Sequence, residues 1–122
     1  MSFTLATWNI NSVRLREAIV LQLLRDEAPD VLCLQECKSP VELIPTAGFA
    51  DLGYPHMVAR GQKGYNGVAI LSKFPLEDAG SLDLAQLGHA RHVAARLPNG
   101  VTIHNHYVPA GGDVPDREQN EK

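Results

Sequence analysis

Two oxygen-bearing side chains, Asn9 and Glu36, each follow a short apolar run, 3–8 and 31–34. An amide oxygen and a carboxylate are hard donors, the kind that Mg²⁺ and Mn²⁺ prefer. Mg²⁺ often takes only one or two protein donors and keeps several waters, so two residues are enough for a partial site. Either residue alone is more typical of a turn or a solvated strand end. Together they predict a site for Mg²⁺, with Mn²⁺ as a possible substitute, provided that the two runs end side by side.

Tyr107 and the glycine-flanked segment 61–64 are further candidates for chemistry. A tyrosine in a strand usually packs half-buried with its hydroxyl at the rim, but its phenol could also donate to a phosphate oxygen on which charge develops. Residues 61–64, Gly-Gln-Lys-Gly, are typical of a hairpin turn. Their glycines would also let backbone N–H groups approach a phosphate, with Lys63 as a point charge.

Histidines and cysteines give weaker signals. His104 and His106 share one face of a strand, but nothing nearby in the sequence supplies a third ligand. The pattern therefore favours half-exposed sheet histidines over a metal site. Cys33 and Cys37 are the only two cysteines, which matches neither a disulfide framework nor a zinc spacing. Reduced thiols in a cytoplasmic protein are the expectation.

The order of elements explains how Asn9 and Glu36 could meet. A strand over 3–8 is followed by a helix, for which Ser12 is a suitable N-cap and Glu27 the approximate end, and then by a second strand from Val31. A strand–helix–strand unit of this length predicts two parallel strands, whose carboxyl ends lie at the same edge of a sheet. Ligands of open α/β sheets collect at that edge.

The remainder of the chain predicts a mixed α/β arrangement. A looser stretch with a short helix extends to about residue 52, and the tail from residue 110 is polar and rich in turn residues, so we expect it to be loose. Turn signals at 61–64 and 97–100 predict antiparallel hairpins. The strand-like runs that they connect are 56–60, 67–72, 91–97 and 101–108.

Composition limits the possible classes of protein. With 122 residues, 44% hydrophobic and 20% charged, the chain is expected to be one globular domain. No apolar stretch approaches the length of a membrane span, so no membrane partner is expected. The net charge of −3 argues mildly against a nucleic-acid surface. Binding depends on one face, however, and an acidic metal site counts as negative until its cation arrives.

Several segments in register resemble one family. Taken together, they are similar to the exonuclease III family of DNA-repair nucleases, which comprises 3′-to-5′ exonucleases and apurinic/apyrimidinic endonucleases of the endonuclease/exonuclease/phosphatase superfamily. Any one of these motifs would be modest evidence, but their order makes the set specific. The segments are 8–14 (WNINSVR), 29–31 (PDV), 34–38 (LQECK), 61–72 (GQKGYNGVAILS) and 105–109 (NHYVP).

The resemblance implies a function and a set of site residues. It implies a Mg²⁺-dependent nuclease that hydrolyses phosphodiester bonds in double-stranded DNA at abasic sites or 3′ ends. By this resemblance Asn9 and Glu36 belong to the metal site, and Tyr107 is the active-site tyrosine near the scissile phosphate. The DNA-facing residues would be Gln62, Lys63 and Arg91.

The resemblance also implies a fold, the four-layer α/β sandwich of the superfamily. Residues 1–109 would form one sheet-plus-helix half of it, followed by a loose tail over 110–122. The inner sheet face would then be open, which predicts self-association of this chain and a monomer for a full-length protein. The family's second half supplies an Asp-x-Asn segment and an Asp-His pair, which nothing after Tyr107 matches. We therefore expect the isolated chain to be inactive.

Two alternatives remain open from the sequence. One is a phosphatase or lipid phosphodiesterase on the same scaffold. The other is a non-catalytic remnant that binds DNA.

Overall fold

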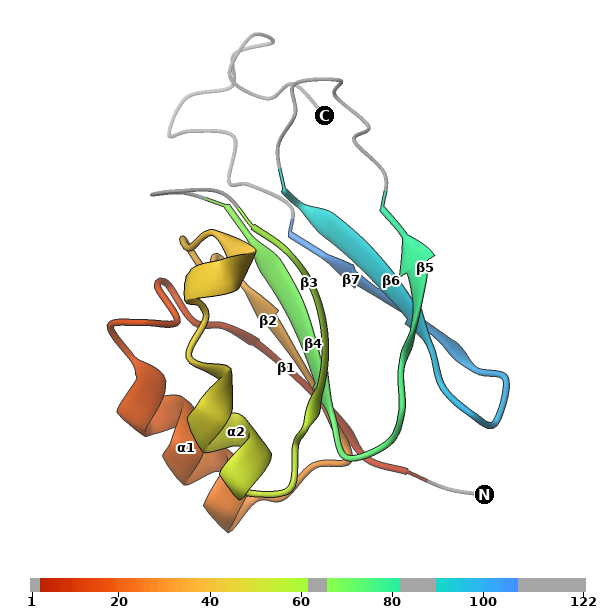
Figure 1. Ribbon diagram of the computed structural model, residues 1–122, viewed down its shortest axis with the longest axis horizontal. Helices are drawn as coiled ribbons and strands as arrows, with labels where there is room; N and C mark the ends of the chain where they lie inside the picture. Colours follow the sequence, from red (N-terminus) through yellow and green to blue (C-terminus); the bar gives the residue numbers. More distant parts are fainter. Residues whose placement is uncertain (1–2, 62–65, 82–89, 108–122) are drawn as a thin grey trace, which may run out of the picture.

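The computed structural model describes residues 3–61, 66–81 and 90–107. These residues form two β-sheets that lie face to face, with two helices on the outer side of the first sheet (Figure 1). The strands are β1 (Leu5–Asn9), β2 (Val31–Gln35), β3 (His56–Arg60), β4 (Val68–Ser72), β5 (Glu77–Gly80), β6 (His92–Arg96) and β7 (Thr102–His106); the helices are α1 (Glu17–Asp26), a 3-10 turn (Val41–Leu43) and α2 (Thr46–Asp51).

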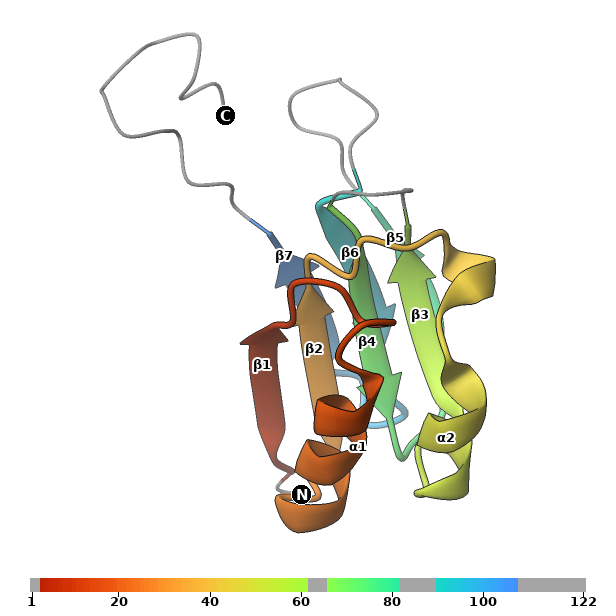
Figure 2. The same ribbon diagram turned by 90° about the vertical axis from the view of Figure 1, so that its left-hand side faces the viewer.

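The first sheet has the strand order β1-β2-β4-β3 (Figure 2). β1 and β2 are parallel, as the strand–helix–strand pattern predicts, and Asn9 pairs with Gln35 at their carboxyl ends. β4 runs antiparallel to both β2 and β3, so the predicted hairpin of β3 and β4 is confirmed. As expected for strands covered on both faces, every residue of β4 is buried, and so are the first four of β2.

The second sheet, β5-β6-β7, is antiparallel and covers the inner face of the first. Ile70 of β4 packs in one core with Val93 of β6 and Ile103 of β7. The mixed α/β class is thereby confirmed. The expectation of an open inner face is wrong for β2, β3 and β4, which β6 and β7 cover, whereas Leu5 of β1 on the same face is 53% exposed. The sequence did not predict β5, because its residues, Glu-Asp-Ala-Gly, do not alternate between apolar and polar side chains.

The helical layer packs on the other face of the first sheet, where Val20 and Leu24 of α1 are buried. The helix begins at Glu17, later than predicted, because residues 13–16 form turns; Ser12 precedes these turns, and its hydroxyl accepts a hydrogen bond from the backbone N–H of Leu15 at 3.3 Å. Ile19, which shares the predicted apolar side, is 49% exposed. No helix among the described residues is long and apolar enough to cross a membrane.

Candidate functional site

The carboxyl ends of β1 and β2 meet the amino end of β4 at one edge of the first sheet (Figure 2). Backbone hydrogen bonds tie the segments that follow these strands into one unit. The loop after β2 is therefore held from both sides and not left free in solvent. The bonds run from Ile10 N to Gln35 O (3.0 Å), Ser12 N to Glu36 O (2.8 Å), Val13 N to Cys37 O (3.0 Å), Cys37 N to Gly67 O (3.0 Å), Lys38 N to Asn66 O (2.8 Å) and Gly67 N to Ala90 O (2.8 Å).

Unusual backbone conformations concentrate at this edge. Of the six non-glycine residues with positive φ in the described part of the chain, all except Ala28 lie here. Such conformations are costly and persist only where the surroundings over-determine them, which is common at functional sites. The five are Asn11 (φ 50°), Ser12 (86°), Glu36 (53°), Lys38 (53°) and Asn66 (56°).

The structure brings Asn9 and Glu36 to the same edge on adjacent strand ends. Gln35, the register partner of Asn9, directly precedes Glu36. Trp8 packs against the core on the helical side of the sheet, so strand alternation places Asn9 on the face toward the second sheet. Asn9 is exposed and Glu36 is partly buried. The predicted convergence of the two strand ends is therefore present, and the metal role of the two residues stays a prediction.

Tyr107 and Arg91 reach the same edge from the second sheet. The backbone N–H of Tyr107 donates to the carbonyl of Arg91 at 2.7 Å, and the side chains of Tyr107 and Glu36 share a hydrogen bond. Burial raises the pKa of the Tyr107 phenol, and the charge and hydrogen bond of Glu36 raise it further, whereas the Arg91 guanidinium acts in the opposite direction. The buried Nε of Arg91 has no hydrogen-bond partner among the described residues.

A network of amide side chains supports this edge, and sequence reasoning missed it. The Asn105 Nδ2 donates to the carbonyls of Leu34 (2.9 Å) and Ala69 (2.8 Å), which joins β7 to β2 and β4. The Gln35 Nε2 donates to the Asn105 Oδ1 (2.7 Å) and to the Thr7 Oγ1 (2.8 Å). The sequence signal that could have revealed this network is the position of Asn105, a polar residue on the inward face of a strand. A buried amide needs hydrogen-bond partners.

The remaining candidates of the glycine-flanked turn, Gln62 and Lys63, lie outside the described residues. Its first residue, Gly61, is described. A Cβ on Gly61 would overlap the carbonyl oxygen of Ser39 and lie 2.7 Å from the backbone nitrogen of Val41. Gly61 therefore packs against the loop that follows Glu36.

The two cysteines are free and buried. Burial raises the pKa of Cys33 to about 11 and that of Cys37 to about 12. Because the thiolate is the reactive form, both are poor nucleophiles at neutral pH. Cys33 packs in the core between the two sheets.

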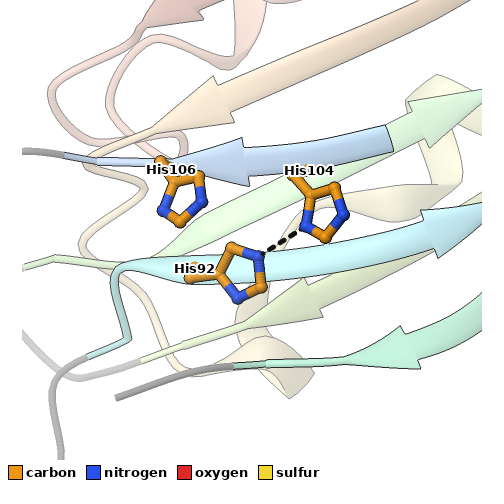
Figure 3. Close-up of side chains that lie close together, drawn as sticks. All are labelled: His92, His104 and His106. Carbon is orange, nitrogen blue, oxygen red and sulfur yellow. Dashed lines mark hydrogen bonds between the residues drawn. The ribbon is translucent and has the colours of Figure 1, made fainter. Parts of the chain in front are cut away.

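The expectation that His104 and His106 lack a third imidazole is wrong. His92 of β6 pairs with His106 of β7 in the strand register and completes a cluster on the outer face of the second sheet (Figure 3). The partner was hidden because it lies far along the chain and only strand pairing brings it close. His92 is 4% exposed, and burial lowers its pKa, as do His106, His104 and Arg60.

Fold and site together define a two-sheet α/β protein in which oxygen donors and a half-buried tyrosine–arginine pair gather where the strands end. The model of the endonuclease/exonuclease/phosphatase family matches residues 6–121, and the chain belongs to this family. It is 40% identical over 67 residues to exodeoxyribonuclease III of Haemophilus influenzae. The aligned segment covers 55% of this chain and 25% of that protein.

Solved structures are similar over most of the chain. An AP endonuclease from Archaeoglobus fulgidus has a TM-score of 0.78 and 38% identity, covering 88% of this chain and 42% of that one. A 3′ phosphatase from Neisseria bound to a product DNA hairpin gives the same TM-score, identity and coverage. The resemblance to exonuclease III is thereby confirmed. The chain spans less than half the length of these solved relatives.

Proposed function

We propose that this chain carries the metal-binding and phosphate-facing part of a Mg²⁺-dependent DNA-repair nuclease. The observation that supports the proposal is the meeting of Glu36, Tyr107 and Arg91 at the sheet edge that also holds Asn9. A carboxylate, a phenol and a guanidinium together offer contacts for a cation and for the oxygens of a phosphate.

The donor set fits a divalent cation. The Asn9 amide oxygen and the Glu36 carboxylate would hold it, with Mn²⁺ as an alternative to Mg²⁺. When bound, the cation would polarise the phosphate and offset the charge that develops on its oxygens. The Glu36 carboxylate also accepts a hydrogen bond from the Tyr107 hydroxyl, so it links the proposed metal position to the phenol.

Tyr107 and Arg91 would contact the phosphate directly. The raised pKa of Tyr107 keeps its phenol protonated at neutral pH, and it can therefore donate a hydrogen bond to a phosphate oxygen. The buried Nε–H of Arg91, which lacks a partner in the described part of the chain, is a second donor. Gln62 and Lys63 remain proposed contacts to the DNA backbone.

The substrate proposed is double-stranded DNA with abasic sites or 3′ ends. The likeness to an AP endonuclease and to a DNA-bound 3′ phosphatase favours it over lipid or inositol phosphates. A DNA 3′-phosphate is a second candidate substrate, favoured by the same DNA-bound relative. A cytoplasmic location, a DNA-repair role and a monomeric full-length protein belong to the same proposal.

Binding of labelled abasic duplex DNA to purified chain, followed by fluorescence anisotropy, tests the proposal. We expect Mg²⁺ to tighten binding, and we expect EDTA or Glu36→Ala to weaken it by about tenfold or more. Glu27→Ala is the matched control, because this exposed carboxylate follows α1 at the opposite edge of the sheet. Retention of DNA that survives both EDTA and Glu36→Ala would favour the non-catalytic binding remnant.

Hydrolysis is a separate test. Glu36 is the only acidic group that the structure places against Tyr107 among the described residues, and it is assigned to the cation. We therefore expect residues 1–122 alone not to cleave DNA. Mg²⁺-dependent nicking of abasic duplex by the purified chain would contradict this expectation. Tighter binding of inositol phosphate than of DNA would favour the lipid branch of the family.

A further inference from the structure

Three histidines form a cluster on the outer face of the second sheet, opposite to the face that carries Asn105 and next to Tyr107 and Arg91 in the chain. His104 and His106 project from β7 and His92 from β6, as Figure 3 shows. Each offers one ring nitrogen, and the three nitrogens all lie within 4.8 Å of one another. His92 is buried, whereas His104 and His106 are exposed. The cluster therefore has one fixed imidazole and two that are open to solvent.

The separations suit coordination by a single ion. The His92 Nε2 lies 3.1 Å from the His104 Nδ1. A tetrahedral Zn²⁺ with Zn–N bonds of about 2.0–2.1 Å separates its nitrogen ligands by about 3.3 Å. The third imidazole is close, since the ring centroids of His92 and His106 are 4.3 Å apart. All three ligand nitrogens lie within 4.8 Å of one another, so the exposed His106 ring must turn to bring the third nitrogen to the distance that one ion requires.

Small residues lie beside the imidazoles on the outer face of the second sheet. Ala94 stands opposite His104 in the strand register, and Gly80 stands opposite Ala94. Arg60 is close enough to act on His92 electrostatically. Its charge is balanced by Asp78, whose carboxylate it contacts at 2.9 and 3.0 Å.

We propose that His92, His104 and His106 form a binding site for a divalent transition metal such as Zn²⁺, Co²⁺ or Cu²⁺, distinct from the Asn9–Glu36 edge. Three neutral imidazoles suit these ions, whereas Mg²⁺ prefers oxygen. Three protein ligands leave a coordination position for water or an exogenous ligand, as in open zinc sites. The two sites are separate because His104 and His106 point outward from β7, whereas Asn105 between them points inward to β2 and β4.

Titration of the purified chain with Co²⁺ and Zn²⁺ tests the proposal. We expect one Co²⁺ to bind with the visible absorption bands of a low-coordinate nitrogen site, and Zn²⁺ to displace it. His104→Ala and His106→Ala, both at exposed positions, should each weaken binding at least tenfold and abolish the bands. His56→Ala, on β3 and outside the cluster, is the matched histidine control, and Glu36→Ala tests independence from the other edge.

Each outcome is decisive. Loss of the bands in both β7 variants, with His56→Ala and Glu36→Ala unchanged, supports the site. Unchanged binding in His104→Ala or His106→Ala overturns it, as does equal weakening by His56→Ala or Glu36→Ala, or the absence of any stoichiometric Co²⁺ binding. Circular dichroism of the two β7 variants confirms that any loss is not due to unfolding.

Discussion

β7 serves two different regions of the molecule through its two faces. Its inward side carries Asn105, and Tyr107 just beyond its end packs toward the core between the sheets. Its outward side carries His104 and His106, which join His92. The inward region, which comprises Asn105, Tyr107 and Glu36, is built from residues in or just after the ends of strands that the sequence motifs mark. The outward cluster of the three histidines is brought together by strand pairing alone. The comparison shows that one strand carries two separate groups of polar side chains, since neighbouring side chains point to opposite faces.

The largest effect is expected from Asn105→Ala, which breaks the inward region. The change removes donors to two carbonyls and the acceptor for Gln35. Leaving buried polar groups without partners should cost about 3–4 kcal/mol of unfolding free energy. Urea denaturation measures the loss, and Asn99→Ala in the exposed β6–β7 turn is the control. A loss below about 0.5 kcal/mol would mean that this amide network does not hold the sheets together.

A smaller effect is expected from Gly67→Ala at the edge. Gly67 has φ +94°, and an added Cβ would lie 3.3 Å from the Cys37 Cβ and from the backbone nitrogen of Lys38. We expect a cost of about 2–3 kcal/mol from backbone strain and contact together. Gly100→Ala is the matched control, since its φ is +89° with open space around it. Equal losses in the two variants would show that the contact with the Glu36 loop adds nothing.

The ionisation of Tyr107 reports whether the inward region is formed in solution. In Glu36→Gln the repulsive charge is gone, so the pKa of Tyr107 should fall toward its ordinary value, although burial still holds it above that value. Spectrophotometric titration at alkaline pH, with Tyr107→Phe to assign the transition, measures the change. A pKa that does not respond to Glu36→Gln would separate the two side chains, and Glu27→Gln should have no effect.

The smallest effect is expected when a histidine of the outward cluster is substituted and the DNA affinity of the inward region is measured. His104→Ala should change the affinity for abasic DNA by less than about twofold, because its ring faces away from the Glu36 edge. Anisotropy under the conditions used for Glu36→Ala measures this. A large loss of DNA affinity in His104→Ala would join the two regions into one functional surface.

Much of the inward region was predictable from the sequence. The parallel pairing of β1 and β2 follows from the strand–helix–strand order, and it alone requires Asn9 and Glu36 to share an edge. The antiparallel pairing of β6 and β7 was signalled by the turn at 97–100. The start of α1 was not predictable, because the turns before it follow Ser12 and Val13, whose backbone N–H groups donate to the loop after β2.

The sequence by itself determined which strands exist, with β5 as the exception, and which polar residues end them, because apolar runs and turn residues act locally. Only the tertiary structure decided that a second sheet closes the inner face, that Asn105 bridges the two sheets, and that His92 completes a cluster with His104 and His106. The physical reason is that these contacts depend on the register and stacking of strands distant in the chain. No local pattern of residues encodes such distances.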